Sequence, residues 1–213
     1  TYPTSNKQLA FLQHIYRALK PGGRAAVVLP DNVLFEANTG AAIRRDLMDK
    51  CNLHTILRLP TGIFYAQGVK TNVLFFSKPE KVSQDTGNTK IVWIYDMRAN
   101  MPSFGKRTAF TRDYFEDFIQ CFGDDKYGNA ERKELEDEAD KQSRWRVFSR
   151  EAIAERGDSL DISWLKDDSP GANDELPEPA ELAREAMAEL EGAFAELRGI
   201  LAELGEDLDE VEA

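Results

Sequence analysis

The sequence predicts an α/β fold with a sheet at its centre. Short apolar runs, rich in β-branched and aromatic side chains, stand at residues 24–29, 53–59 and 71–76. Such runs are too short to be good helices and indicate buried strands. Helix-like stretches precede the first two runs, and an alternation of helix and strand is typical of α/β proteins. At 213 residues the chain is long enough for one domain with a core plus an additional segment.

The first helix is expected to begin after Ser5. Ser5 stands three residues before Gln8, a capping-box spacing, and apolar residues then recur at helical period as far as Leu19. Pro21 and the two glycines after it end this helix. Residues 24–29, RAAVVL, follow directly and predict a fully buried parallel strand.

The next elements alternate in the same way. Residues 31–40 are loop-like, and residues 41–50 predict a helix capped by Thr39 or Asn38. Strands are predicted at residues 53–59 and 71–76, and a further strand at residues 92–95. An amphipathic helix is predicted at residues 111–122, with a buried stripe formed by Tyr114, Phe115, Phe118, Ile119 and Phe122.

The rest of the chain divides by composition. Residues 123–143 are charged and predict an exposed helix, whereas residues 167–179, DDSPGANDELPEP, read as a linker. Apolar residues between 183 and 211 then alternate steps of four and three, which is a heptad pattern of about four repeats. We therefore expect three regions, 1–123, 124–177 and 178–213. By itself such a heptad helix more often packs within its own chain than on a partner.

Charge is distributed unevenly along the chain. The net charge is -11, but residues 1–123 carry 16 basic and 10 acidic side chains, and residues 178–213 carry 2 and 12. The first region is mildly basic, so the charge excludes no class of partner, nucleic acid included. No apolar run is long enough for a membrane span and no signal peptide opens the chain, so a cytoplasmic location is expected. The two cysteines and two histidines lack ligand spacing, and no metal site is expected.

Candidate site residues gather where the predicted strands end. Ligands of open α/β sheets bind outside the carboxyl ends of the parallel strands. If residues 24–29 and 53–59 are parallel neighbours, a strand at 71–76 that returns through a short loop runs antiparallel and starts at the same edge. The side chains expected there are Asp31, Asn32, Phe64, Lys70 and Asn72. Strand 24–29 would keep one unpaired edge, so its missing partner strands are expected before residue 1 or in another chain.

Three stretches resemble a known family. They are LKPGGRAAVVLPDNVLF (19–35), CNLHTILRLPTGIFYAQGVKTNVLFFSK (51–78) and WIYDMR (93–98). Together they are similar to the modification (HsdM) subunit of type I restriction-modification systems, among the adenine-N6 DNA methyltransferases. The resemblance covers roughly residues 1–165, and GIF-x4-V-x3-VLFF is its most specific part.

The resemblance implies a fold and a chemistry. The fold would be the C-terminal part of a Rossmann-like class I methyltransferase sheet, namely its last three strands with the final one antiparallel, followed by C-terminal helices. Phe64 matches the aromatic that lines the pocket for a flipped adenine, where stacking returns roughly 1 to 3 kcal/mol. The cofactor would be S-adenosylmethionine. The partners would be DNA, the specificity and restriction subunits of a type I complex, and the N-terminal part of the same subunit. The heptad helix at 178–213 would serve subunit assembly, because C-terminal helices of the modification subunit meet helices of the specificity subunit in this family.

Two motifs of this family do not occur in the sequence. A Phe-x-Gly-x-Gly turn would hold the cofactor, and an Asn/Asp-Pro-Pro-Phe/Tyr tetrapeptide would bind the adenine amino group. The chain contains no glycines two residues apart and no adjacent prolines. We therefore expect no catalytic residue in these 213 residues and an isolated chain that neither binds S-adenosylmethionine tightly nor methylates DNA.

Each candidate residue has a plainer interpretation. Phe64 could pack on the sheet, Lys70 could be a solvated lysine and Asn72 could satisfy loop backbone. Asp31 and Asn32 after Pro30 indicate a turn in the first place, and residues of a cofactor pocket only in the second. At the level of the chain, the alternative function is a non-catalytic assembly module that docks through its C-terminal helix, and an RNA or small-molecule methyltransferase is a third.

Overall fold

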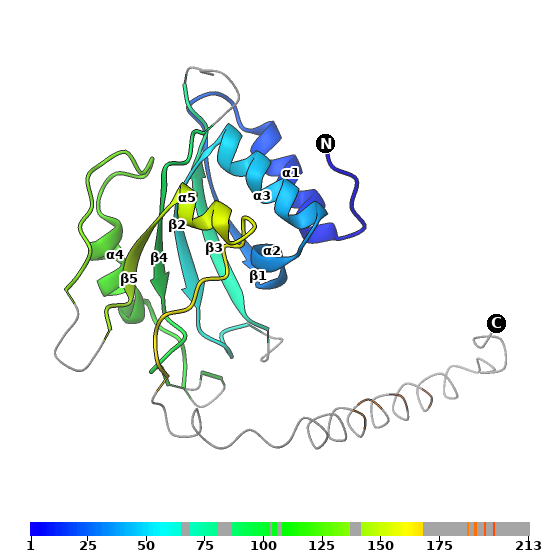
Figure 1. Ribbon diagram of the computed structural model, residues 1–213. Coiled ribbons are helices and arrows are strands. Elements are labelled where there is room, and N and C mark those ends of the chain that lie inside the picture. The colour runs from blue at the N-terminus through cyan, green and yellow to red at the C-terminus, as the bar shows by residue number, and fades with distance from the viewer. Residues whose placement is uncertain are drawn as a thin grey trace. The chain divides into compact units, whose positions relative to one another are not determined.

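The structure, a computed structural model, describes residues 1–64, 69–80, 87–102, 104–105, 108–136 and 142–167, together with residues 187, 190, 194 and 198. The chain divides into two units, Thr1–Ser169 and Pro170–Ala213. The first unit is an α/β fold with helices on both faces of one sheet (Figure 1).

The sheet has five strands in the order β1-β3-β2-β4-β5. They are β1 (Arg24–Pro30), β2 (Asn52–Leu59), β3 (Thr71–Ser77), β4 (Ile91–Asp96) and β5 (Trp145–Ser149). β3 is antiparallel to β1 and to β2, β4 is parallel to β2, and β5 is antiparallel to β4. Strands form at all three apolar runs, and β2 and β3 are mostly buried because β-branched and aromatic side chains fit a pleated, buried surface. β1 is not the fully buried parallel strand that was predicted, since Val28 is 52% exposed and β1 pairs antiparallel with β3.

The strand order corrects one expectation. β1 and β2 run in the same direction but are not neighbours, because β3 lies between them. Pro30 and Leu59 both pair with Thr71, so the carboxyl ends of β1 and β2 meet at the start of β3. Among the described residues β1 pairs only with β3, which leaves its other edge unpaired.

Helices cover the two faces unequally. α1 (Lys7–Ala18) and α3 (Thr39–Lys50) lie on one face, and α4 (Glu116–Phe122) lies on the other (Figure 1). The first core contains Leu9, Leu12, Tyr16, Ile43, Leu47, Leu53, Ile56, Leu74 and Phe76, among others. The second contains Leu57, Leu59, Trp93, Tyr95, Phe118 and Trp145, and its aromatic rings pack closely.

Two local expectations near the N-terminus are wrong. Asn6, not Ser5, caps α1, since its Oδ1 accepts hydrogen bonds from the backbone N–H groups of Gln8 (3.0 Å) and Leu9 (3.3 Å). The expected loop 31–40 contains a one-turn helix, α2 (Asn32–Phe35), because burial of its apolar side chains fixes a turn that the surrounding polar sequence does not suggest. Asn38 is the N-cap residue of α3 but makes no side-chain cap bond.

The predicted helix 111–122 is divided. It starts as η1 (Arg112–Phe115) and continues as α4. Phe118 is buried as predicted, whereas Ile119 is 49% exposed and does not belong to the stripe.

No helix forms among residues 124–136, which corrects the helix expected at 123–143 in the part that is described. The Asp125 carboxylate instead accepts hydrogen bonds from the N–H groups of Tyr127 (2.9 Å), Asn129 (2.5 Å) and Ala130 (2.6 Å). These bonds offer the backbone an alternative to the helical pattern.

The segment after β5 returns across the sheet. α5 (Arg150–Glu155) begins at the cap Ser149, and residues 158–167, which we term the strap, follow it. Figure 1 shows the strap in yellow, running toward the end of the sheet where the β2 and β4 arrowheads lie. No helix within the described ranges has the length and apolar character needed to cross a membrane.

The second unit is described only at four positions. Residues 187, 190, 194 and 198 are helical, and the apolar ones, Met187, Leu190 and Phe194, are exposed. The expected linker 167–179, apart from Asp167, and the rest of the expected helix 183–211 lie outside the described residues.

Candidate functional site

The carboxyl ends of three strands meet at one edge of the sheet. Thr71 at the start of β3 pairs with the last residues of β1 and β2, and Asp96 at the end of β4 pairs with Arg58 of β2. Side chains from the segments that follow these strands therefore gather at a single rim. We term it the carboxyl rim.

Asp31 and Asn72 form a polar cluster at this rim together with Arg98. Asn72 Nδ2 donates to Asp31 Oδ1 at 2.8 Å. The Arg98 guanidinium donates to both Asp31 oxygens, at 3.0 and 2.5 Å, and to Asn72 Oδ1 at 2.9 Å. Such paired charge-assisted bonds are stronger and more directional than neutral ones. The cluster holds the residue after β1 against the start of β3.

The electrostatics of the cluster favour ionised Asp31. Partial burial alone would raise the pKa of Asp31, but hydrogen bonds from Arg98 and Asn72 and the nearby guanidinium charges outweigh it, and the pKa is lowered. A carboxylate held in this form is a weak proton acceptor. Asn72 is fully buried and its amide is committed within the cluster. Both side chains are therefore engaged in the cluster at the rim.

Phe64 and Lys70 are the predicted site residues that face solvent. Phe64, at the end of the turn after β2, has 43% of its surface exposed, and Lys70 is exposed just before β3. The Lys70 carbonyl accepts a hydrogen bond from the Asp31 N–H at 3.0 Å, which ties its backbone to the segment after β1. Residues 65–68, between these two positions, lie outside the described part of the chain.

Asn32 contributes through its backbone. It is the first residue of α2, is half-buried, and its carbonyl accepts a hydrogen bond from the Glu36 N–H at 2.8 Å. This bond closes the turn of α2.

A second arginine lies beneath the rim. The buried Arg58 of β2 is 3.5 Å from Asp96 and 2.5 Å from Asp161, and it also donates to the Ile162 carbonyl of the strap. The Asp96 carboxylate in turn accepts a hydrogen bond from the Arg98 N–H at 2.8 Å. The chain of contacts from the strap thus continues through Arg58 and Asp96 to Arg98.

Arg58, Asp96 and Arg98 are absent from the residues predicted from sequence. The sequence does contain a pattern that points to two of them, because Asp96 and Arg98 follow the predicted strand 92–95 closely. Placing that strand in the same sheet, parallel to residues 53–59, would have brought both side chains to the carboxyl rim by the rule that selected Asp31.

Other features of the surface do not add a site at the rim. A cavity of about 1400 Å³ lies beside α4 and the coil 123–136, lined by side chains of both charges and by none of the predicted site residues. Within the described residues no three or more His, Cys, Asp or Glu side chains are grouped to hold a metal ion.

Comparison with family models decides the family of the chain. The N-6 DNA methylase model matches residues 1–168, and the model for the C-terminal domain of the type I restriction enzyme methylase subunit matches residues 176–213. The chain belongs to the N-6 DNA methylase family. The resemblance drawn from residues 19–35, 51–78 and 93–98 is confirmed.

Individual relatives give the same result. The chain is 56% identical to the type I restriction enzyme StySJI methylase subunit of Salmonella typhimurium over an alignment of 234 positions, gaps included, which covers all of this chain and 44% of that protein. It matches the crystal structure of the EcoKI M protein with a TM-score of 0.75 at 54% identity, over all of this chain and 47% of that one. A structure from a study of assembly of a type I system matches with a TM-score of 0.57 at 28% identity, covering 99% and 41%. The chain therefore spans somewhat under half the length of these relatives.

Proposed function

We propose that this chain is the C-terminal part of the modification subunit of a type I restriction-modification system. In the complete subunit, its carboxyl rim would form one wall of the pocket that receives an adenine flipped out of DNA. The exposed ring of Phe64 at that rim is the observation that carries the proposal. A flipped adenine loses its stacking in the duplex, and one aromatic face returns roughly 1 to 3 kcal/mol of it.

The reaction would be transfer of a methyl group to the adenine N6 atom, and S-adenosylmethionine would supply that methyl group. Asp31 and Asn72 are engaged with Arg98, and the sequence has no Phe-x-Gly-x-Gly turn, so we expect the main cofactor contacts to come from the N-terminal part of the subunit. What this chain supplies is a stacking surface at Phe64 and a cation at Lys70 that can contact a DNA phosphate.

The partners follow from the same proposal. The unpaired edge of β1 is suited to a strand from the N-terminal part of the same subunit, since an exposed strand edge presents free N–H and C=O groups. That pairing would complete a Rossmann-like class I sheet in which β1, β2 and β3 are the last three strands. DNA, a specificity subunit and a restriction subunit would complete the assembly, in the bacterial cytoplasm.

One observation fits the alternative of a non-catalytic assembly module as well as the proposed function. Met187, Leu190 and Phe194 are exposed on one helix. Such a surface serves association whether or not the chain takes part in catalysis, so the helix alone does not choose between the two functions.

Substitution of Phe64 tests the proposal. In the complete subunit assembled with its specificity subunit, Phe64→Ala should lower the methylation rate about 5- to 150-fold, the equivalent of roughly 1 to 3 kcal/mol. Binding of S-adenosylmethionine, measured by calorimetry, should change little. The matched control is Phe11→Ala, which removes an aromatic ring that is 66% exposed on α1. Equal methylation rates for the two variants would show that Phe64 has no part in stacking.

A further inference from the structure

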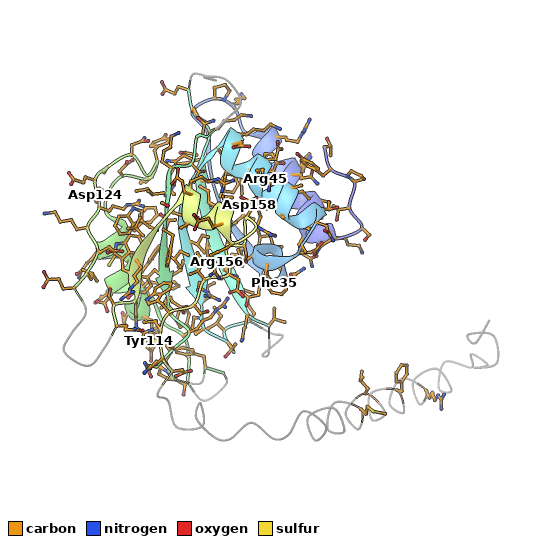
Figure 2. All side chains as sticks on the ribbon, viewed as in Figure 1. Phe35, Arg45, Tyr114, Asp124, Arg156 and Asp158 are labelled. Atoms are coloured by element: carbon orange, nitrogen blue, oxygen red, sulfur yellow. The ribbon has the colours of Figure 1, made fainter. Side chains whose placement is uncertain are left out.

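The segment that follows β4 contacts both parts of the carboxyl rim. Its described residues between 97 and 114 leave the sheet at the end of β4, where the Met97 N–H donates to the Arg58 carbonyl at 3.0 Å. Figure 2 shows the labelled Tyr114 at the end of the sheet to which the β2 and β4 arrowheads point in Figure 1. One contact of this segment is polar, through Arg98, and the other is made by the backbone of Phe104.

Arg98 is the polar contact. Its guanidinium spans two segments, since it binds both oxygens of Asp31 after β1 and the side-chain oxygen of Asn72 in β3. It also approaches the Thr71 carbonyl at 3.4 Å. The bond from its own N–H to Asp96 fixes where the side chain starts. One arginine therefore sets the spacing between the residue after β1 and the start of β3.

Phe104 contacts the turn that carries Phe64. Gly62 has φ +83°, and a Cβ there would lie 2.2 Å from the Phe104 carbonyl oxygen and 2.9 Å from its carbon. Only glycine permits both this conformation and this approach. The Phe64 turn is therefore seated directly on the Phe104 backbone.

Phe104 is itself held in place by aromatic packing. Its buried ring lies edge-to-face to Phe110 at 4.9 Å and to Tyr114 at 5.0 Å. Phe110 also stacks on Tyr114 at 5.5 Å and meets Phe115 at 4.9 Å. Aromatic pairs with these geometries add stabilisation beyond the apolar area that they bury. The support beneath the Phe64 turn thus extends to η1.

We infer that the described residues between 97 and 114 are a brace that positions Phe64 for the target base. Arg98 and Phe104 are its positioning residues, and neither is expected to touch substrate. The inference rests on the proposed role of Phe64. A catalytic step tolerates little misplacement, and a shift of about 1 Å can lower a rate on the order of 100-fold. Loosening the brace should therefore lower kcat and leave cofactor binding unchanged.

Gly62→Ala is the direct test, because the chain offers a matched control. Gly123 has φ +72°, and a Cβ there would meet nothing within 4 Å. Gly123→Ala therefore places a Cβ at a positive φ without the clash. Both variants are made in the complete subunit with its specificity subunit, on DNA whose methylated adenine has been mapped. We expect kcat to fall about 10- to 100-fold for Gly62→Ala and to stay within about threefold of wild type for Gly123→Ala.

The Arg98 contact has its own pair of variants. Arg98→Gln removes the charged fork and should lower kcat in the same way, whereas Arg98→Lys keeps the charge and should recover part of the rate. The control is Lys50→Gln, which breaks a lysine–carboxylate contact to Asp46 on α3 instead of the contact at the rim. If Gly62→Ala does not assemble, Phe104→Leu tests the same contact, because it keeps the backbone carbonyl of residue 104 and removes the packing of its ring on Phe110 and Tyr114.

A spectroscopic measurement separates positioning from loss of folding. With 2-aminopurine at the target adenine, a flipped base that Phe64 does not stack should fluoresce more strongly. We expect this increase for Gly62→Ala, Arg98→Gln and Phe64→Ala, with KM for DNA and thermal melting close to those of the controls. If Phe64→Ala lowers the rate but the brace variants behave like their controls, the brace is wrong and the proposed function still holds. Wild-type rate and fluorescence in Phe64→Ala would overturn the proposed function, and the brace with it.

Discussion

At the scale of single residues, His54 makes the stability of this protein depend on pH. The ring is 2% exposed, and Nδ1 lies 2.8 Å from Thr55 Oγ1, to which Arg132 also donates. Burial first, and then the charge of Arg132, lowers the pKa of His54 from 6.5 to about 4, and Asp125 opposes this only weakly. The imidazole is therefore neutral in the folded protein at a pH where the unfolded chain binds a proton.

The sign of the effect follows from that difference. Well above pH 6.5, His54 is neutral in both the folded and the unfolded state, and its contribution to stability is fully present. As the pH falls from 6.5 to 4, His54 binds a proton in the unfolded state but stays neutral in the folded state. The free energy of unfolding should fall by about 3 kcal/mol over this window. Asp31 and Asp46, whose pKa values are lowered, add their loss only below about pH 4.

Urea unfolding at a series of pH values measures this contribution. His54→Gln, which can still bond to Thr55 but does not titrate, should flatten the profile between pH 6.5 and 4. His14→Gln, at the other and exposed histidine, should leave the profile unchanged. An undiminished slope in His54→Gln would assign the pH dependence to other groups.

For single residues, the sequence predicts where a site side chain lies better than it predicts which residue that side chain contacts. Strand ends are visible in the sequence, so Asp31 and Asn72 are placed at one edge before the structure is known. Their common partner Arg98 follows β4, which begins 14 residues after the end of β3, beyond the polar run 78–89. Long-range ion pairs leave no local pattern, and this one depends on which strands pair.

At the scale of elements, the cap of α1 gives a direct measurement. Asn6 accepts two backbone N–H groups of the first turn, and its own amide donates to Glu36 at 2.6 Å. Asn6→Ala should lower the free energy of unfolding by about 1 kcal/mol, the usual cost of a lost cap. Ser5→Ala, at the exposed neighbour that the capping-box spacing selects, should change it by less than about 0.5 kcal/mol. If Ser5→Ala destabilises the protein more than Asn6→Ala in denaturant unfolding, Ser5 and not Asn6 is the cap of α1.

The elements that the sequence misses depend on distant contacts. The strap is fixed at Asp158, which is 1% exposed and accepts Arg45 Nε at 2.9 Å, while Arg150 Nη2 lies 2.6 Å from its other oxygen. Figure 2 shows the labelled Arg45 and Asp158 close together, although they come from α3 and from the strap. Arg44 also donates to the Asp158 carbonyl at 2.7 Å. Contacts across more than 100 residues hold this segment, whereas local periodicity suffices for α1, β1 and α3.

At the scale of the whole molecule, two surfaces call for partners. One is the edge of β1, which has an exposed Val28 and no strand beside it among the described residues. The other is the C-terminal helix with its exposed Met187, Leu190 and Phe194. The proposed function accounts for both surfaces, because the complete subunit and its partners would bury areas that this chain, which spans under half of its relatives' length, leaves exposed.

The C-terminal surface yields a prediction about assembly. Leu190 and Phe194 belong to the heptad pattern, and burial of each such side chain contributes about 1.5 to 3 kcal/mol. If the helix packs on the specificity subunit, replacing both with Asp should weaken association by at least about 3 kcal/mol, or roughly 100-fold in Kd. Deletion of residues 178–213 should abolish association. Both are measured by titration of the complete modification subunit with its specificity subunit.

Position along the helix provides the control for that experiment. Arg198 is helical and exposed but lies outside the heptad pattern, so Arg198→Ala should leave Kd within about threefold of wild type. Melting of the modification subunit alone separates the two packings. A double variant that melts at lower temperature but associates normally would place the seam inside the subunit. A double variant that melts as wild type does and no longer associates would place it between subunits, because the apolar seam is then buried only in the complex.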